Sequence, residues 1–437
     1  MHTDPQTHQD LELFQARDGG ASVLTVLDRT ATRPGLKRLS DVLRHPLSDP
    51  AAIRARLQAV AWLHRGGHRF DVPVGALEAV RAYVDSTYAT ASGGNALGRA
   101  VDSTLIALRY RDLLRHARGG VQAMGKLLSE VGRFMRRLDG GDAPTEVWRI
   151  CEEVREVTDA IRSSGLADPG PYWRTLEVDR LLRSGLRDEI HRLLDLMAEL
   201  DALAAAALLL DEGWVLPELV EHEGAWLEGE GLWHPFLPEA VRNPVSLRGG
   251  ETLVFLTGPN MAGKTTYLRA VGLCMHLAHC GLPVPAERFA FASVDRFLTG
   301  LSPEDNLREG ISYFLAEVRR VRQVVEAVAR GERVVAIFDE VFRGTNVADA
   351  LDASRAVLRG CSRADTSAFI FSSHLWELAD ELTDLDSVRL CYFDGDLGAS
   401  ELSFDYRLRS GVSSKRFGME LLRREGVEEL LAGIGGA

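Results

Sequence analysis

The chain has 437 residues, of which 51 are Lys or Arg and 63 are Asp or Glu, so its formal net charge is −12. Its 46% hydrophobic and 26% charged residues are typical of globular proteins and argue against a disordered chain. The longest apolar run, 202–210, is far shorter than the roughly 20 residues that span a bilayer, and the polar N-terminus does not resemble a secretory signal. The acidic balance excludes a uniformly basic nucleic-acid binder but permits a local basic patch.

The cysteines provide a second exclusion. They are odd in number and form no C-x-x-C pair, which argues against a disulfide framework or a zinc site. We therefore expect a reducing, cytoplasmic location and no membrane association. The five cysteines are Cys151, Cys274, Cys280, Cys361 and Cys391.

Residues 11–215 have the pattern of a helical domain, which we expect to follow a polar tail at 1–10. The segment 176–210 is the clearest helix, because its apolar side chains recur at steps of three and four residues. An Asp-Pro-Gly-Pro sequence breaks the chain before it. The glycine pairs at 119–120 and 140–141 are expected to interrupt earlier helices.

From residue 216 onward, short apolar runs alternate with helical stretches. Strands buried on both faces have continuous apolar sequences, and their alternation with helices predicts a parallel sheet. Alternating apolar and polar residues at 402–408 predict an antiparallel strand at one edge. The apolar runs lie at 252–256, 334–338, 368–371 and 388–393.

A glycine-rich segment after the first apolar run matches the pattern G-x-x-x-x-G-K-[ST]. Such a loop points backbone N–H groups at phosphate oxygens, aided by the positive end of the following helix. Lys264 is predicted to contact the β- and γ-phosphates of ATP, and the Thr265 hydroxyl to bind Mg²⁺. A strand–helix turn with a surface lysine is the disfavoured alternative. The predicted ATP-binding residues are Gly258, Pro259, Asn260, Met261, Ala262, Gly263, Lys264, Thr265 and Thr266.

Two acidic residues follow the second apolar run. The end of that strand would deliver Asp339 and Glu340 to the carboxyl edge of the sheet, beside the phosphate loop. Asp339 is predicted to hold Mg²⁺, and Glu340 to orient or deprotonate the attacking water. Adjacent acids at a strand end are usually solvated surface charge, but the upstream phosphate loop favours the catalytic interpretation.

A histidine follows the third apolar run. His374 comes directly after Phe371-Ser372-Ser373, where a polar side chain could sense the γ-phosphate. A lone histidine is more often an ordinary core or surface residue. The position at the end of a strand in a nucleotide-binding sheet favours a catalytic role for His374 alongside Lys264 and Glu340.

Together these segments resemble the MutS mismatch-repair ATPases. The phosphate loop at 257–269, with its Pro-Asn-Met insert, is similar to that of the family, as is the acidic segment at 339–346 with its trailing Arg-Gly-Thr. The segment 310–317 resembles the family's signature segment, and Ser373-His374 its Thr-His. Further likenesses occur at 27–47, at 233–243 and at 406–420.

The resemblance implies an α-helical core and lever domain at 11–215, with its clamp reduced or absent, followed by an ATPase domain at 216–437. The second domain would be an α/β P-loop NTPase, ABC-like, with a mostly parallel sheet, an antiparallel edge and C-terminal dimerisation helices. ATP and Mg²⁺ are the implied cofactors and a homodimer the implied assembly. In the family, the signature serine, here Ser312, reaches the partner subunit's γ-phosphate. Ser312 also fits a helix N-cap, and the two roles are compatible.

The resemblance also leaves differences. The family commonly stacks adenine on an aromatic residue where this chain has Ala240, while Tyr406 matches a second stacking position and fits equally well as an inward-facing strand residue. Mismatch-repair members carry two domains before the helical core, including a Phe-x-Glu wedge, whereas this chain begins almost at that core. We therefore expect recognition of DNA shape rather than of mispairs through the wedge.

One segment of the helical region is strongly basic although the chain is acidic. Only Asp112 and Glu130 oppose its eight basic residues, so it could contact a phosphate backbone without reading sequence. A solvated helix face is the equally weighted alternative. The candidate DNA contacts are Arg109, Arg111, Arg115, Arg118, Lys126, Arg133, Arg136 and Arg137.

The leading hypothesis is a homodimeric, Mg²⁺-dependent, DNA-binding ATPase of repair or recombination. The alternative is a nucleotide-gated module that docks a protein partner and binds no DNA. A transporter-type or chromosome-structural ATPase is disfavoured, because the chain has no Leu-Ser-Gly-Gly-Gln signature, long heptad repeat or membrane span.

Overall fold

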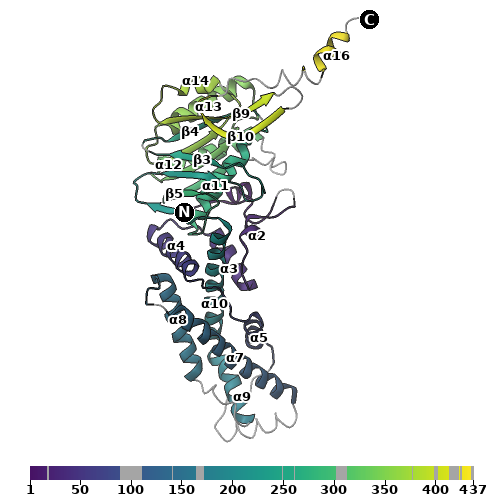
Figure 1. The fold of residues 1–437 in the computed structure, drawn as a ribbon, viewed down its shortest axis with the longest axis vertical. Coiled ribbons are helices and arrows are strands. Elements are labelled where there is room, and N and C mark those ends of the chain that lie inside the picture. The colour runs from purple at the N-terminus through teal and green to yellow at the C-terminus, as the bar shows by residue number, and fades with distance from the viewer. Residues whose placement is uncertain are drawn as a thin grey trace. The chain divides into compact units, whose positions relative to one another are not determined.

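The computed structural model divides into two compact units, which we call the helical unit and the sheet unit (Figure 1). The helical unit comprises Leu27–Val42 and Ala55–Glu212, and the sheet unit comprises Met1–Val26, Leu43–Arg54 and Gly213–Ala437. The boundary predicted at 215/216 lies close to Gly213, but the sheet unit also takes in two earlier segments of the chain. The structure describes residues 1–16, 19–88, 111–139, 141–163, 172–248, 250–259, 261–301, 313–375, 377–397, 402–412, 423 and 426–434.

Within the described residues, no helix is both long enough and apolar enough to cross a membrane.

Amphipathic helices make up the helical unit. The short helix α2 (Val23–Leu27) ends where this unit begins, and α3 (Arg33–Arg44) and α4 (Pro50–Arg65) lie partly within it. Its other helices are α5 (Val74–Val84), α7 (Arg111–Leu138), α8 (Thr145–Ser163), α9 (Tyr172–Arg180) and α10 (Arg187–Leu208), with a π-helical turn at Leu181–Gly185 and a 3₁₀ turn at Leu209–Glu212.

The continuous helix predicted over 176–210 is interrupted. A π-helical turn separates α9 from α10, and the amide of Leu186 donates to the carbonyl of Leu181 at 2.8 Å. The buried guanidinium of Arg183 lies in this turn and donates to the carbonyls of Ser86 and Tyr88. This long-range interaction, together with the weak helix propensity of Gly185, accounts for the break.

The prediction that the glycine pair 119–120 interrupts a helix is wrong, because both residues lie inside α7. Gly120 is buried where α7 packs on α5, and a Cβ atom there would lie 2.0 Å from the ring of Tyr83. Glycine therefore permits a close approach of two helices at this point. The second pair follows the end of α7 at Leu138; of its members, Gly140 lies outside the described residues.

The sheet unit contains a six-stranded sheet with the order β10-β9-β4-β8-β7-β6. The strands from β9 to β6 run parallel and β10 runs antiparallel to β9, so the predicted sheet with one antiparallel edge is confirmed. Strands β4, β7 and β8 are buried on both faces, as continuous apolar sequences require. The strands are β4 (Leu253–Thr257), β6 (Arg296–Gly300), β7 (Val334–Asp339), β8 (Ala368–Ser372), β9 (Val388–Leu397) and β10 (Leu402–Ser410).

A four-stranded sheet with the order β1-β5-β2-β3 was not predicted. Helix α11 (Lys264–His279) packs against β7 of the six-stranded sheet and against β2 and β5 of this one, and nearly all its side chains are buried. Burial lowers the pKa of both His276 and His279 to about 3, so both imidazoles are neutral. The strands are β1 (Glu218–Val220), β2 (Leu227–Leu232), β3 (Asn243–Leu247) and β5 (Arg288–Ala292).

The remaining helices of the sheet unit connect its strands or lie near its ends. Helix α12 precedes β7, α13 lies between β7 and β8, and α14 lies between β8 and β9. They are α1 (Pro5–Asp10), α12 (Tyr313–Ala329), α13 (Val347–Cys361), α14 (Glu377–Leu382) and α16 (Val427–Gly433).

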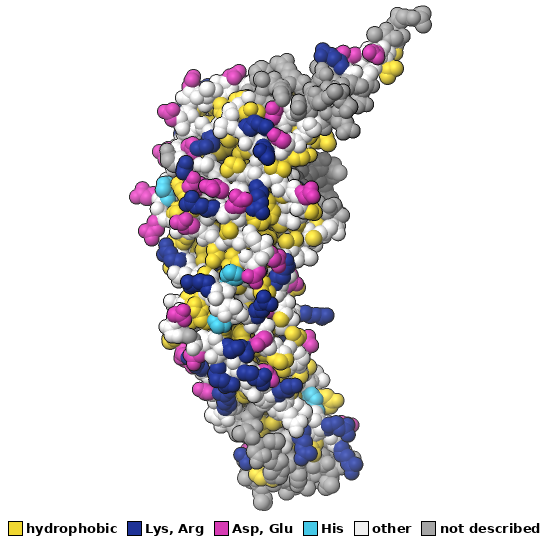
Figure 2. All heavy atoms as spheres, in the orientation of Figure 1, with side chains coloured by type: hydrophobic (Ala, Val, Ile, Leu, Met, Phe, Trp, Pro, Cys, Tyr) yellow, Lys and Arg dark blue, Asp and Glu magenta, His cyan; other side chains and the backbone are white. Residues whose placement is uncertain are grey.

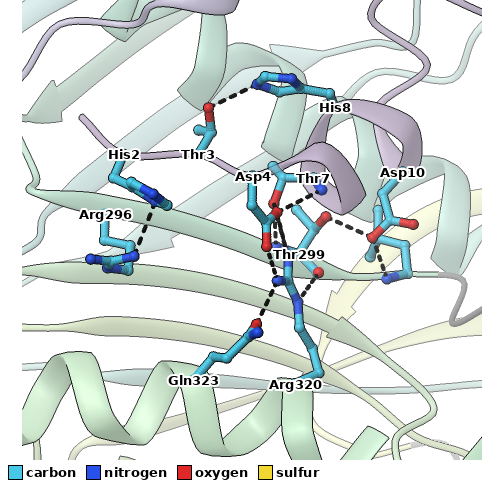
Figure 3. A network of polar contacts seen from close by, with 11 residues as sticks. His2, Thr3, Asp4, Thr7, His8, Asp10, Arg296, Thr299, Arg320 and Gln323 are labelled. Carbon is cyan, nitrogen blue, oxygen red and sulfur yellow. Dashed lines mark hydrogen bonds and ion pairs between the residues drawn. The ribbon is translucent and has the colours of Figure 1, made fainter. Parts of the chain in front are cut away.

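The first ten residues do not form a polar tail as predicted. Asp4 caps helix α1, which packs along β6 (Figure 3). The buried side chain of Asp10 accepts a hydrogen bond from Thr299 at 2.7 Å, and Asp4 pairs with the buried Arg320 of α12. Polar side chains can be buried in this segment because partners within the sheet unit satisfy their hydrogen-bonding groups.

The two neighbouring glycines of α7 provide a test of this packing. Replacing Gly120 with Ala forces a methyl group into the ring of Tyr83 and is expected to lower the free energy of unfolding by about 1–3 kcal/mol. Gly119→Ala is the matched control, because its added methyl group would point into open space. Its higher helix propensity is expected to raise the free energy of unfolding by about 0.5–1 kcal/mol. Chemical denaturation measures both; a stabilised Gly120→Ala variant would contradict the packing.

Candidate nucleotide-binding site

The carboxyl ends of β4, β7 and β8 meet at one edge of the six-stranded sheet, as parallel strands require. After β4 the chain turns through the glycine-rich loop into α11, whose first residue is Lys264. Gly258 has a φ of 142°, and a Cβ atom there would lie 2.7 Å from the carbonyl oxygen of Phe393. Gly263, with a φ of 97°, directs the chain into the helix. Glycine is therefore required at both ends of the loop.

Lys264 is buried at the start of α11, with 5% of its surface exposed. Its ammonium donates to the carbonyls of Gly258 (2.8 Å) and Pro259 (3.1 Å) and lies 3.5 Å from a carboxylate oxygen of Glu340. Burial lowers the pKa of Lys264, and the nearby carboxylates of Glu340 and Asp339 oppose that decrease. A cation held in this way can exchange the loop carbonyls for phosphate oxygens.

Asp339, the last residue of β7, meets the phosphate loop. The hydroxyl of Thr265 donates to its Oδ2, while Oδ1 is buried with no hydrogen-bond partner among the described residues. A hydroxyl and a carboxylate with one free oxygen are hard ligands of the kind that Mg²⁺ prefers beside substrate phosphates. The residues present therefore fit the predicted metal.

Glu340 follows β7 with its backbone in the left-handed region, at a φ of 51°. Its amide donates to the carbonyl of Ser372 at 2.8 Å, which fixes the residue against the end of β8. Its side chain is 7% exposed and pairs with Lys264 and Arg343. Nδ1 of His374 lies 3.9 Å from Glu340 Oε2, so the three predicted catalytic residues Lys264, Glu340 and His374 are brought together.

A cavity of about 740 Å³ opens beside these groups, a size that suits a nucleotide. Gly258 and Ala262 of the loop are not among the residues that line the cavity, and neither is His374. Met261 lines the cavity although 81% of its surface is exposed. The predicted residues that line the cavity are Pro259, Met261, Gly263, Lys264, Thr265, Thr266, Asp339, Glu340 and Tyr406.

Tyr406 covers the phosphate loop from β10. A ring carbon of Tyr406 lies 3.1 Å from where a Cβ atom of Gly263 would be. The backbone φ of Tyr406 is 55°, and the residue lies at an irregularity in the β9–β10 register. Asn243 of β3 holds this turn: its amide donates to the carbonyl of Tyr406 at 2.9 Å, and its oxygen accepts from the amide of Leu408 at 2.8 Å. A bulge thus aims the tyrosine at the cavity.

Several apolar side chains also line the cavity. Ala240 is among its lining residues, and Leu237 and Val241 beside it are exposed hydrophobic side chains. Trp233 also lines this region and lies under the guanidinium of Arg242, 4.5 Å from the ring centroid. These side chains and Tyr406 provide surface for a flat base although the aromatic residue expected at position 240 is missing.

Sequence reasoning did not assign two residues of the site. Arg343 lines the cavity and pairs with Glu340, and Asn243 anchors Tyr406. The Arg-Gly-Thr after the acidic pair was a signal for Arg343, whereas the role of Asn243 depends on a contact 163 residues away. Asn260 and Ser312 lie outside the described residues, as does Arg109.

The remaining candidate DNA contacts belong to the helical unit. All seven are exposed residues of α7, whose apolar face is buried. They are Arg111, Arg115, Arg118, Lys126, Arg133, Arg136 and Arg137.

Comparison with known proteins identifies two matching regions. Residues 254–431 match the family model of MutS domain V, and residues 6–139 match that of MutS domain III. The DNA mismatch repair protein MutS of Natronomonas pharaonis is 32% identical over 282 residues, which are 63% of this chain and 32% of that protein. Proteins of the same name from Persephonella marina and Aquifex pyrophilus are 28% and 31% identical, over 56% and 59% of this chain and 28% and 31% of their own lengths.

The chain thus matches about a third of the length of these relatives. The domain V match, to the ATPase domain of MutS, contains the phosphate loop, both acidic residues, His374 and Tyr406. The two models match in the order III then V and leave 140–253 between them. On these matches the chain belongs to the MutS family.

Proposed function

We propose that this protein is a Mg²⁺-dependent ATPase that works as a homodimer and binds branched or distorted duplex DNA through its helical unit. The observation that carries the ATPase proposal is the convergence of Lys264, Thr265, Asp339 and Glu340 on one nucleotide-sized cavity. These four residues come from two segments that the sheet brings to one edge. ATP binding is further supported by the match to MutS domain V.

In the proposed reaction, the amides of the phosphate loop and the Lys264 ammonium hold the β- and γ-phosphates. Thr265 and Asp339 would hold Mg²⁺, which when bound neutralises charge on the phosphate oxygens. Glu340 orients the attacking water and accepts its proton. His374, 3.9 Å from Glu340, would contact that water or the γ-phosphate.

The dimer part of the proposal rests on the family. Ser312 would meet the γ-phosphate bound by the partner subunit, so ATP would favour the closed dimer and hydrolysis would release it. ATP can shift this equilibrium only by its differential affinity for the two states. The C-terminal segment, whose described part includes α16, would add to the dimer contact.

The distribution of charge supports DNA binding by the helical unit. The whole surplus of negative charge belongs to the sheet unit, with 26 basic and 38 acidic residues, whereas the helical unit has 25 of each. Lys and Arg side chains are prominent on the visible face of the helices (Figure 2). A neutral unit with segregated basic groups does not repel a polyanion as the whole chain would.

Helix α7 segregates those basic groups. At 100° per residue its seven described basic side chains fall within an arc of roughly 100°, in a stripe about 40 Å long. Arg115, Arg133 and Arg137 pair with carboxylates, but no ion pair to a described residue occurs for Arg118, Lys126 or Arg136. Contacts from such a stripe to phosphates position a duplex without reading its sequence.

Replacing Lys264 tests the nucleotide site. Lys264→Ala removes the ammonium that contacts the phosphate loop from the start of α11, and is expected to weaken ATP binding at least 100-fold and to abolish hydrolysis. Titration calorimetry and phosphate release measure the two effects. Hydrolysis at the parental rate in this variant would refute the assigned phosphate loop.

Replacing Glu340 separates binding from chemistry. Glu340→Gln keeps the shape of the side chain but removes the base, so kcat is expected to fall by about 10²–10⁴-fold while ATP still binds. Because hydrolysis would reopen the dimer, the variant should accumulate as a closed dimer with ATP, detectable by light scattering. A parental turnover rate would show that Glu340 does not activate the water.

Reversing three charges of the α7 stripe tests the DNA proposal. The triple variant Arg118→Glu, Lys126→Glu and Arg136→Glu is expected to lose at least tenfold in affinity for a four-way junction at moderate salt. The slope of log K against log salt should become shallower by about 3, because each phosphate contact contributes about 0.9. Fluorescence anisotropy across a salt series measures both quantities.

The matched control reverses three exposed arginines elsewhere in the helical unit, Arg65, Arg69 and Arg174, and should retain most of the affinity. Equal losses in both triple variants would assign the effect to net charge alone. If the parental protein binds no homoduplex, mismatch, junction or single strand even at low salt, with or without ATP, the nucleotide-gated protein-interaction module replaces the DNA proposal.

A further inference from the structure

A buried glutamate near the start of α12 contacts the loop that follows the catalytic acids. Glu317 is 4% exposed, and its Oε2 accepts from the amide of Gly344 at 3.5 Å. Burial raises the pKa of Glu317, and hydrogen bonds from the amides of Gly344, Arg343 and Phe342 oppose that rise. The Gly344 amide thus donates to Oε2 and the amides of Arg343 and Phe342 face the same carboxylate, whereas Oε1 is buried with no hydrogen-bond partner among the described residues.

A close backbone approach and an aromatic contact join the same loop to the same helix. A Cβ atom on Gly344 would lie 2.7 Å from the backbone nitrogen of Phe314, so the two backbones are in close contact. The ring of Phe342 is 3% exposed and lies 5.9 Å from that of Phe314. The loop 342–344 is therefore held against α12 through its amides, its backbone and a buried ring.

This attachment matters because the loop is conformationally costly. Both Phe342 (φ of 70°) and Glu340 (φ of 51°) adopt left-handed backbone, which costs about 1–3 kcal/mol for such residues and persists only where the surroundings enforce it. Arg343 belongs to the same loop, and its side chain pairs with Glu340 at the cavity. A change at the loop would therefore alter the direction of the catalytic carboxylate.

We propose that Glu317 is a positioning residue for ATP hydrolysis, whose carboxylate fixes the 342–344 loop and thereby holds Arg343 and Glu340 in their catalytic geometry. This inference rests on the proposed ATPase function. Glu317 does not line the cavity, so it acts through the loop and not on ATP. The ATP-binding contacts of the phosphate loop are separate from it, so its loss should affect turnover and not affinity.

The test is steady-state ATP hydrolysis by Glu317 variants of the full chain. Glu317→Ala is expected to lower kcat at least tenfold while KM for ATP stays within twofold of the parental value. Glu317→Gln retains an oxygen that can accept the same amides and should keep at least a third of the parental kcat. The matched control is Glu326→Gln, which removes an exposed carboxylate of the same helix that pairs only with its neighbour Arg322 among described residues and should leave kcat unchanged.

A double variant identifies the route of the effect. If Glu317 acts by placing Arg343, then Glu317→Ala combined with Arg343→Ala should be no slower than Arg343→Ala alone. Independent, multiplicative losses would overturn the proposal. So would an unchanged kcat in Glu317→Ala, even if its thermal midpoint falls, because that result assigns Glu317 a purely structural role.

Failure of the positioning role can be distinguished from misfolding of a variant and from failure of the proposed ATPase function. If Glu317→Ala does not fold, Glu317→Asp decides: its shorter side chain keeps the charge but cannot reach the loop amides, so the same loss of kcat is expected and a parental kcat refutes the inference. If the parental protein itself does not hydrolyse ATP, the proposed function fails. If the parent hydrolyses ATP and the Glu317 variants do so equally fast, only the positioning role fails.

Discussion

Charge balance at one edge of the six-stranded sheet governs the arrangement of the site. A buried ammonium and two carboxylates at a strand end are costly unless each has partners close by. The Lys264 ammonium donates to the carbonyls of its own loop and pairs with Glu340, and the Thr265 hydroxyl donates to Asp339. These interactions hold the groups in place without closing the cavity, and each can be exchanged for a phosphate oxygen or a cation.

The scaffold around this edge is rigid where the chemistry needs precision. Helix α11 carries Lys264 and Thr265 into a core between two sheets, where its two histidines are neutral because burial lowers their pKa values. The N-terminal segment binds β6 and α12 through buried polar side chains (Figure 3). Helix α12 in turn contacts the loop after Glu340 through Glu317. Catalytic groups supported by packed helices and strands keep their geometry better than groups on free loops.

Local patterns explain what could be predicted from the sequence. The buried strands β4, β7 and β8 are continuous apolar runs, and the phosphate loop and acidic pair follow two of them directly. Contacts between distant residues explain the misses: glycine occupies position 120 inside a helix because the Tyr83 ring leaves no room for a side chain, and Arg183 lies at a helix interruption where it binds two distant carbonyls. Likewise Asn243 and Glu317 lie in segments that resemble the family, but their roles could not be assigned from sequence, because only tertiary structure brings them to Tyr406 and to the 342–344 loop.

The most direct test of the account is a crystal structure with Mg²⁺ and a non-hydrolysable ATP analogue. We expect the Lys264 ammonium to leave the loop carbonyls for the β- and γ-phosphate oxygens, with the metal between Thr265 and Asp339 and the base near Tyr406. A nucleotide bound elsewhere, or a Lys264 that keeps its loop carbonyls while the phosphates remain in solvent, would contradict it.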